Sequence, residues 1–173
     1  MRNIQFSSTV FAVFLLVSLS SKVANAQSNG DEALRDIIQA YYKVYKTRND
    51  FERFLSFYDE SIVLQDMISG ARIIGKKALS TFFDWNNPDF QLLGTESLVI
   101  ENQILEERQI VTSGHFTSFK WGEHIFGPMY FTTILTLNKK GKITRHVDWI
   151  NYPSDLINYE KRKNSNAWIG KEN

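Results

Sequence analysis

Three segments in the first half of the chain carry apolar residues at three- and four-residue spacing, the pattern of amphipathic helices. The first segment covers residues 30–50, and its apolar stripe consists of Leu34, Ile37, Ile38, Tyr41, Tyr42 and Tyr45. The second covers residues 50–60, where Asp50 is placed to cap the N-terminal end. The third covers residues 76–85 and stops before Pro88. We therefore predict three N-terminal helices.

The rest of the chain shows the shorter periodicity and the turn residues that are typical of β-strands. Residues 61–68 and 71–75 predict a small hairpin around Ser69 and Gly70. Longer strands are predicted in series at 90–103, 104–121, 127–138 and 142–151. Residues 154–170 predict a C-terminal helix. This order indicates an α+β fold, in which a strongly curved antiparallel sheet wraps the N-terminal helices and leaves a cone-shaped hollow.

Polar residues interrupt the last of these strands. Successive side chains on a strand point to opposite faces of the sheet. One face therefore carries Thr144, His146, Asp148 and Ile150, and the other carries Arg145, Val147 and Trp149. An imidazole and a carboxylate side by side on one face are either a functional pair or polar groups that need partners elsewhere.

The first 26 residues have the three-part pattern of a secretory signal peptide. Arg2 precedes an apolar run at residues 10–19, and Ala24-Asn25-Ala26 forms a cleavage pattern. The apolar run is too short to span a bilayer. We predict a signal peptide at 1–26 and a single domain at 27–173 with a C-terminal helical tail. The mature protein is then exported, periplasmic or secreted, with no stable insertion in a membrane.

Composition excludes several classes of function. Residues 1–26 contain two basic residues and no acidic one, so their removal changes the net charge from +1 to −1. This balance argues against a nucleic-acid-binding protein. The chain has no Cys, and its three His residues form no metal-binding motif, so we expect neither thiol chemistry nor a metal. With 13 Phe, 7 Tyr and 4 Trp, the chain has enough aromatic residues for a packed core and an aromatic-lined cavity.

The order of elements and the stretch 41–83, YYKVYKTRNDFERFLSFYDESIVLQDMISGARIIGKKALSTFF, resemble the nuclear-transport-factor-2-like superfamily, in its SnoaL-like and ketosteroid-isomerase branches. In ketosteroid isomerases a first-helix Tyr precedes a carboxylate base by 24 positions, and a Gly and a Phe follow. The residues Tyr42, Asp66, Gly75 and Phe82 match this spacing. Residues 127–150 resemble the last two strands of the same fold. The resemblance implies a cofactor-free protein with an apolar pocket, and dimers that form through the outer face of the sheet, so we predict a homodimer.

Two positions depart from the isomerase pattern. The second acidic residue of the oxyanion hole is replaced by Thr133, counted back from Gly141, and the supporting Tyr is replaced by Phe83. These departures argue against steroid isomerisation.

The resemblance assigns candidate roles to four polar residues. Asp66 is either a general base in an apolar strand end or a cap of the turn at Ser69 and Gly70. Tyr42 is either an oxyanion donor or a core tyrosine of the first helix. His146 and Asp148 form an acid–base or ligand-binding pair facing the hollow; alternatively, Asp148 neutralises Arg145 or a helix side chain, or the pair lies at a dimer interface. The residues expected to line the pocket are His115, Phe119, Trp121, Phe131, Thr133 and Ile150.

Two functional hypotheses follow. The first is a cofactor-free isomerase, cyclase or dehydratase in which Asp66 or Asp148 moves a proton on a small hydrophobic carbonyl compound. In this hypothesis Tyr42 and His146 stabilise the oxyanion. The second is an exported module that binds a small hydrophobic molecule in the same hollow without catalysis. The two hypotheses are separated by whether the four polar side chains converge on one cavity.

Overall fold

The computed structural model describes residue 30 and residues 32–152. The predicted signal peptide and the predicted C-terminal helix lie outside the described residues. The first helix covers residues 32–47, and α2 (Phe51–Ser56) and α3 (Lys76–Phe83) follow. Asp50 caps α2 as predicted, because its carboxylate accepts a hydrogen bond from the Arg53 backbone N–H at 2.8 Å. Helix α2 is shorter than predicted because the next strand already begins at Tyr58.

The main sheet has six strands in the order β2-β1-β9-β8-β5-β4. Their bounds are β1 (Tyr58–Asp66), β2 (Arg72–Ile74), β4 (Leu98–Glu106), β5 (Gln109–Phe116), β8 (Met129–Leu137) and β9 (Ile143–Ile150). Neighbouring strands are antiparallel except β1 and β9, which run parallel with Asp66 opposite Asp148. The curved, mainly antiparallel sheet confirms the predicted fold class, and the parallel pair is a feature that the sequence did not predict. The pairing places Asp66 on β1 next to Asp148 on β9.

A second, three-stranded sheet is formed by β3 (Phe90–Leu92), β6 (Phe119–Trp121) and β7 (His124–Phe126). The sequence predicted β3 and β6 as parts of the continuous strands 90–103 and 104–121, and it predicted a loop where β7 lies; both predictions are wrong. Each long stretch bends, so that its outer part pairs away from the main sheet. The reversal between the two long strands falls at Glu107, which has a positive φ of 51°, and not at residue 104.

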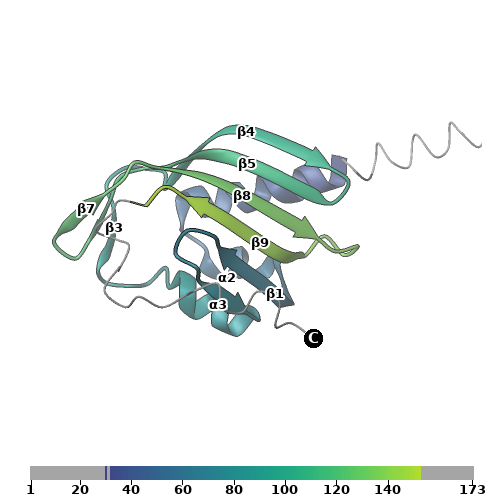
Figure 1. Ribbon diagram of the computed structural model, residues 1–173, viewed down its shortest axis with the longest axis horizontal. Coiled ribbons are helices and arrows are strands. Elements are labelled where there is room, and N and C mark those ends of the chain that lie inside the picture. Colours follow the sequence, from purple (N-terminus) through teal and green to yellow (C-terminus); the bar gives the residue numbers. More distant parts are fainter. Residues whose placement is uncertain (1–29, 31, 153–173) are drawn as a thin grey trace, which may run out of the picture.

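The main sheet curves over the helices, and the small sheet projects from one end (Figure 1). The first helix lies behind β4, β5 and β8, whereas α2 and α3 lie near β1 (Figure 1). Large side chains fill the space between helices and sheet, and those with no exposed surface include Tyr41, Phe54, Ile62, Leu64, Leu79, Leu98, Ile110 and Leu135. None of the helices in the described part of the chain is both long and apolar enough to cross a bilayer.

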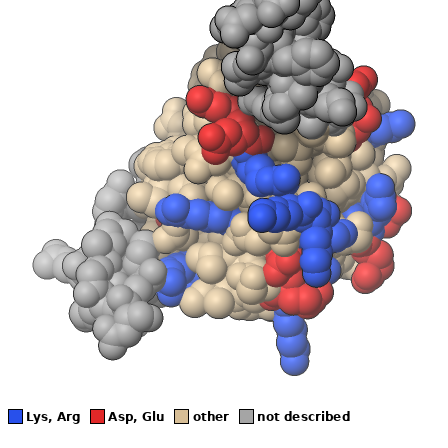
Figure 2. All heavy atoms as spheres, turned by 90° about the vertical axis from the view of Figure 1, so that its right-hand side faces the viewer, with Lys and Arg blue, Asp and Glu red and all other residues tan. Residues whose placement is uncertain are grey.

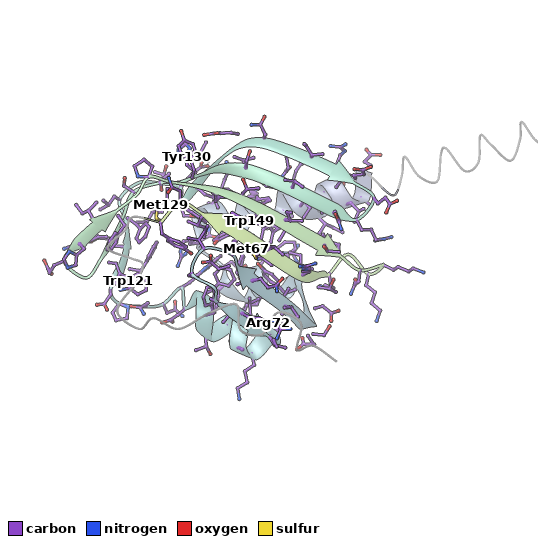
Figure 3. All side chains as sticks on the ribbon, viewed as in Figure 1. Met67, Arg72, Trp121, Met129, Tyr130 and Trp149 are labelled. Carbon is purple, nitrogen blue, oxygen red and sulfur yellow. The ribbon has the colours of Figure 1, made fainter. Side chains whose placement is uncertain are left out.

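The outer face of the main sheet carries aromatic side chains in the open. Tyr130 on β8 is 64% exposed and Trp149 on β9 is 39% exposed (Figure 3). Trp149 therefore lies on the outer face, as the alternation along residues 142–151 predicts. On a different side of the molecule, basic and acidic side chains lie close to one another and form no surface of a single charge (Figure 2).

Gly114 lies in β5 where β4 shifts its register between Ile100 and Asn102. A Cβ atom at this position would lie 2.0 Å from the Val99 carbonyl oxygen. We expect Gly114→Ala to lower the free energy of unfolding by about 3 kcal/mol, since backbone must move to admit the methyl group. Urea unfolding measures the loss. Gly94→Ala is the matched control, because nothing lies within 4 Å of a Cβ there; similar losses in both variants would contradict the steric explanation.

Candidate functional site

A pocket of about 440 Å³ opens between the first helix, α3, the small sheet and the ends of β1 and β9. Nine of its twenty lining residues are aromatic: Tyr45, Phe82, Phe83, Phe90, Phe116, Phe119, Trp121, Phe126 and Tyr152. Its charged lining residues are Arg48, Asp66, Asp84 and Asp148. The volume suits a small organic molecule, and the wall suits an apolar body with a few polar groups.

Asp148 reaches the pocket from β9, and its carboxylate is held at both oxygens. Thr133 on β8 donates its hydroxyl to Oδ1 at 2.5 Å. His146 lies 3.0 Å from Oδ2 through its Nε2 atom. The His146 side chain is 1% exposed and that of Asp148 is 12% exposed, so Asp148 is the more solvent-exposed member of the pair. The alternation along β9 therefore predicted correctly that the two side chains share the inner face.

Two tyrosines continue this chain of hydrogen bonds into the core. The Tyr58 hydroxyl lies 3.0 Å from His146 Nδ1, and the Tyr41 hydroxyl lies 2.8 Å from that of Tyr58. When Asp148 is ionised it accepts from His146 Nε2–H, which leaves Nδ1 as an acceptor for Tyr58. Tyr58 then accepts from Tyr41. This arrangement satisfies each hydrogen-bonding atom of the imidazole with a neutral ring.

Burial raises the pKa of Tyr41 and of Tyr58 well above the ordinary tyrosine value. The neighbouring hydroxyl of Tyr58 raises the pKa of Tyr41 further. Both hydroxyls therefore remain protonated at physiological pH, so that Tyr58 donates to His146 and Tyr41 donates to Tyr58. The result is a rigid support that fixes the orientation of His146 and, through it, of Asp148.

Asp66 caps the turn, as one of its two interpretations predicted, and it also lines the pocket. Its Oδ1 accepts from the backbone N–H groups of Ile68 and Ser69, at 2.9 and 3.1 Å, which is the turn cap. Its Oδ2 accepts from the Tyr152 hydroxyl at 2.5 Å, and both residues line the pocket. Burial, followed by the hydrogen bond to Asp66, raises the pKa of Tyr152, so this phenol also stays protonated.

Of the tyrosines on the first helix, Tyr45 lines the pocket and Tyr42 does not. Tyr42 is buried near Thr112, its hydroxyl has no hydrogen-bond partner among the described residues, and the residue borders a separate depression beside Lys46. Burial raises the pKa of Tyr45, and the negative charge of Asp148 raises it further. Tyr45 is therefore a protonated phenol near Asp148, in the place where the sequence suggested Tyr42. Of the four polar residues predicted to converge on one cavity, Asp66 and Asp148 line the pocket, His146 lies behind Asp148, and Tyr42 lies elsewhere, so the predicted convergence is only partial.

The other residues expected around the pocket fall into two groups. Phe119, Trp121 and Ile150 line the pocket, and Thr133 reaches it indirectly through Asp148. His115 and Phe131 are not among its lining residues. His115 pairs with Glu101 at 3.0 Å, and Phe131 packs against Phe116 with ring centroids 4.8 Å apart. Within residues 32–152, no three His, Asp or Glu side chains are grouped so that they could hold a metal ion.

Three residues of the site were not predicted from the sequence: Tyr58, Tyr152 and Arg48. Tyr58 was assigned to the second helix, and only the helix end at Ser56 places it on β1. Tyr152 follows β9 directly, where no periodic pattern applies. Asp66, in contrast, was predicted, and its burial follows the strand pattern: Ile62 and Leu64 precede it at two-residue spacing on the buried face of β1.

Solved structures share this fold. A SnoaL-like protein of Shewanella putrefaciens CN-32, inferred to be a polyketide cyclase, is 18% identical with a TM-score of 0.58; the match covers 69% of this chain and 90% of that one. A protein of Catenulispora acidiphila DSM 44928 with a ketosteroid isomerase-like fold, in complex with trimethylamine, is 12% identical with a TM-score of 0.55, over 75% and 95% of the two chains. TerC, co-crystallised with polyporic acid, is 16% identical with a TM-score of 0.54, over 71% and 93%.

No protein-family model matches the sequence, and the search of curated proteins finds no match. The structural matches show that the chain has the fold of nuclear-transport-factor-2-like proteins, as the resemblance of residues 41–83 predicted.

Proposed function

We propose that the protein is an exported acid–base enzyme of the SnoaL-like kind, acting on a small hydrophobic carbonyl compound without a cofactor. The observation that carries the proposal is the Asp148–His146 pair, because the Asp148 carboxylate lines an aromatic pocket. Tyr58 supports the pair by a hydrogen bond to the other ring nitrogen of His146. Two structures of the same fold contain small ligands, trimethylamine and polyporic acid, which supports the binding of a small molecule by this protein.

Asp148 is the group that we assign as the general base. It would accept a proton from the carbon next to a substrate carbonyl, and the electron pair of the broken C–H bond would move onto the carbonyl oxygen. The protonated phenol of Tyr45 is placed to donate a hydrogen bond to that oxygen. Return of the proton to another carbon completes an isomerisation. Attack of the carbanion on a second carbonyl, whose oxygen then takes the proton from Asp148, completes a cyclisation.

Asp148 suits this role better than Asp66 because of what surrounds each carboxylate. Asp66 is held by two backbone N–H groups and Tyr152, none of which can take up a proton at neutral pH. Asp148 contacts an imidazole whose second nitrogen is an acceptor. Asp148 accepts one hydrogen bond at each oxygen, from Thr133 and from His146, so a lone pair remains for the proton of the substrate, which stays on Asp148 until it is returned.

Asp148→Asn is expected to reduce catalysed proton exchange by about 100-fold or more, the scale of a missing general base. The assay follows deuterium uptake next to the carbonyl of small aromatic ketones such as 2-tetralone, by NMR in deuterated buffer. Asp66→Asn should retain most of the rate.

Asp59→Asn is the control, since Asp59 bonds Ser61 and Asn138 outside the pocket. Exchange that survives in Asp148→Asn would remove the assigned base. Ketone binding without any exchange above buffer in the wild type would favour the alternative, a small-molecule-binding module.

A further inference from the structure

Arg48 is a pocket residue that the reaction above does not use. Its guanidinium lies over two aromatic rings, 5.0 Å from the centroid of Trp85 and 4.1 Å from that of Phe90. No carboxylate of the described residues lies within ion-pair distance of it. A half-buried guanidinium with stacking partners but no anion keeps its hydrogen-bond donors available to a ligand.

The backbone at Arg48 is held in an unfavourable conformation. Its φ is +48°, in the left-handed region, and its N–H bonds the Val44 carbonyl at 2.9 Å to end the first helix. Glycine, or less often asparagine, fills this position at helix ends with less strain. The backbone conformation at this position favours glycine, which has no side chain, yet the residue is an arginine. This indicates that the arginine side chain itself has a role.

The charges around the pocket also differ from one part to another. Burial lowers the pKa of Arg48, but a guanidinium remains protonated in proteins. The charges of Arg48 and Asp148 both act on the Tyr45 hydroxyl: Asp148 raises its pKa and Arg48 lowers its pKa. An anionic group in the pocket would be attracted to Arg48 and repelled by the three lining carboxylates, Asp66, Asp84 and Asp148. Asp66 and Asp148 are neighbours on the paired strands β1 and β9.

We propose that Arg48 is the receptor for an acidic group on the pocket's ligand, so that the pocket selects aromatic molecules bearing a carboxylate, a sulfonate or a comparable oxyanion. The planar guanidinium binds such a group through two parallel N–H donors. The acidic group at Arg48 would direct the apolar body along the aromatic wall toward Asp148. This inference deepens the proposed function by naming its substrate class, and it needs only binding, not turnover.

The test compares two fluorescent probes that share one aromatic body. The probes are 1-anilinonaphthalene-8-sulfonate, which carries an acid, and N-phenyl-1-naphthylamine, which does not. Arg48→Gln is expected to weaken binding of the sulfonate about 10- to 100-fold, the loss of a charge-assisted hydrogen-bond pair, and to change binding of the neutral probe less than about twofold. Arg48→Lys should restore part of the sulfonate affinity.

Arg53→Gln is the matched control, because Arg53 also stacks on a ring, Phe57 at 4.9 Å, but does not line the pocket. Far-UV circular dichroism and thermal unfolding check that each variant is folded. Equal loss of both probes in Arg48→Gln would make Arg48 a packing residue and overturn the proposal, as would unchanged sulfonate binding or a wild type that binds neither probe. Asp148→Asn should keep the preference for the sulfonate, so failure of the proposed catalysis is distinguishable from failure of this inference.

Discussion

Replacing His146 by leucine is expected to lower the free energy of unfolding by about 3–5 kcal/mol, the range for breaking a buried hydrogen-bonded pair from one side. His146 has almost no exposed surface, and both of its ring nitrogens are engaged. Its removal leaves the Asp148 carboxylate with one donor fewer and the buried Tyr58 hydroxyl without its acceptor. Leucine is similar in volume, so a cavity adds little. Urea unfolding at pH 7, followed by tryptophan fluorescence, measures the change.

The chain offers a matched control in His115. This residue also contacts a carboxylate at 3.0 Å, Glu101, but its side chain is 30% exposed on the outer part of the sheet. His115→Leu is therefore expected to change the free energy of unfolding by no more than about 0.5 kcal/mol. Similar losses at the two histidines would show that the buried hydrogen bonds contribute no more than an exposed pair.

A double variant separates the pair interaction from simple loss of volume. In His146→Leu/Asp148→Leu no charge remains to be desolvated, so we expect a smaller loss than the sum of the two single losses. Strict additivity would mean that His146 and Asp148 stabilise the fold independently. The stability of this pair also bears on function, because a carboxylate held at both oxygens keeps one orientation toward the pocket.

The part of the site that the sequence predicted well is the part governed by local periodicity. On β9 the alternation of two places His146, Asp148 and Ile150 on the inner face, and the structure has them there. Alternation works here because β9 is a central strand, flanked by β1 and β8, with one face toward the core.

Periodicity was less informative on the first helix. The curved sheet surrounds this helix, so its apolar stripe is broad and Tyr41, Tyr42 and Tyr45 all belong to it. The structure gives the three residues different roles: Tyr41 supports Tyr58, Tyr42 packs toward Thr112, and Tyr45 lines the pocket. The family spacing selects Tyr42, but which of the three reaches the pocket depends on how the helix is rotated against the sheet.

Contacts between distant segments could not be derived from local pattern at all. Tyr58 and His146 are 88 residues apart, and Tyr152 and Asp66 are 86 apart. Both contacts depend on the parallel pairing of β1 with β9, which no turn or loop connects directly. Arg48 is hidden for another reason: its backbone conformation at the helix end is one that a sequence reader expects at glycine.

Cooperative unfolding in alkali is expected to begin just above pH 10, because five tyrosines share an environment that opposes their ionisation. Burial is the largest cause of the raised pKa in each of Tyr41, Tyr42, Tyr45, Tyr58 and Tyr152. Below pH 10 these groups are protonated in both the folded and the unfolded chain, so they make stability independent of pH. Above pH 10 the unfolded chain releases protons that the folded chain retains, and stability falls as pH rises.

The expected slope is steep. Each tyrosine contributes about 1.4 kcal/mol per pH unit, so five contribute about 7 kcal/mol per unit, against a total stability of about 5–15 kcal/mol for an ordinary domain. Tyrosinate absorbance at 295 nm should therefore rise together with the loss of far-UV circular dichroism, within about two pH units. Tyr42→Phe, which leaves the His146 hydrogen bonds intact, should reduce the slope by about a fifth. Absorbance that rose gradually while the circular dichroism stayed native would show that the folded protein lets these phenols ionise, and would remove the basis for treating Tyr45 as a permanent donor in the pocket.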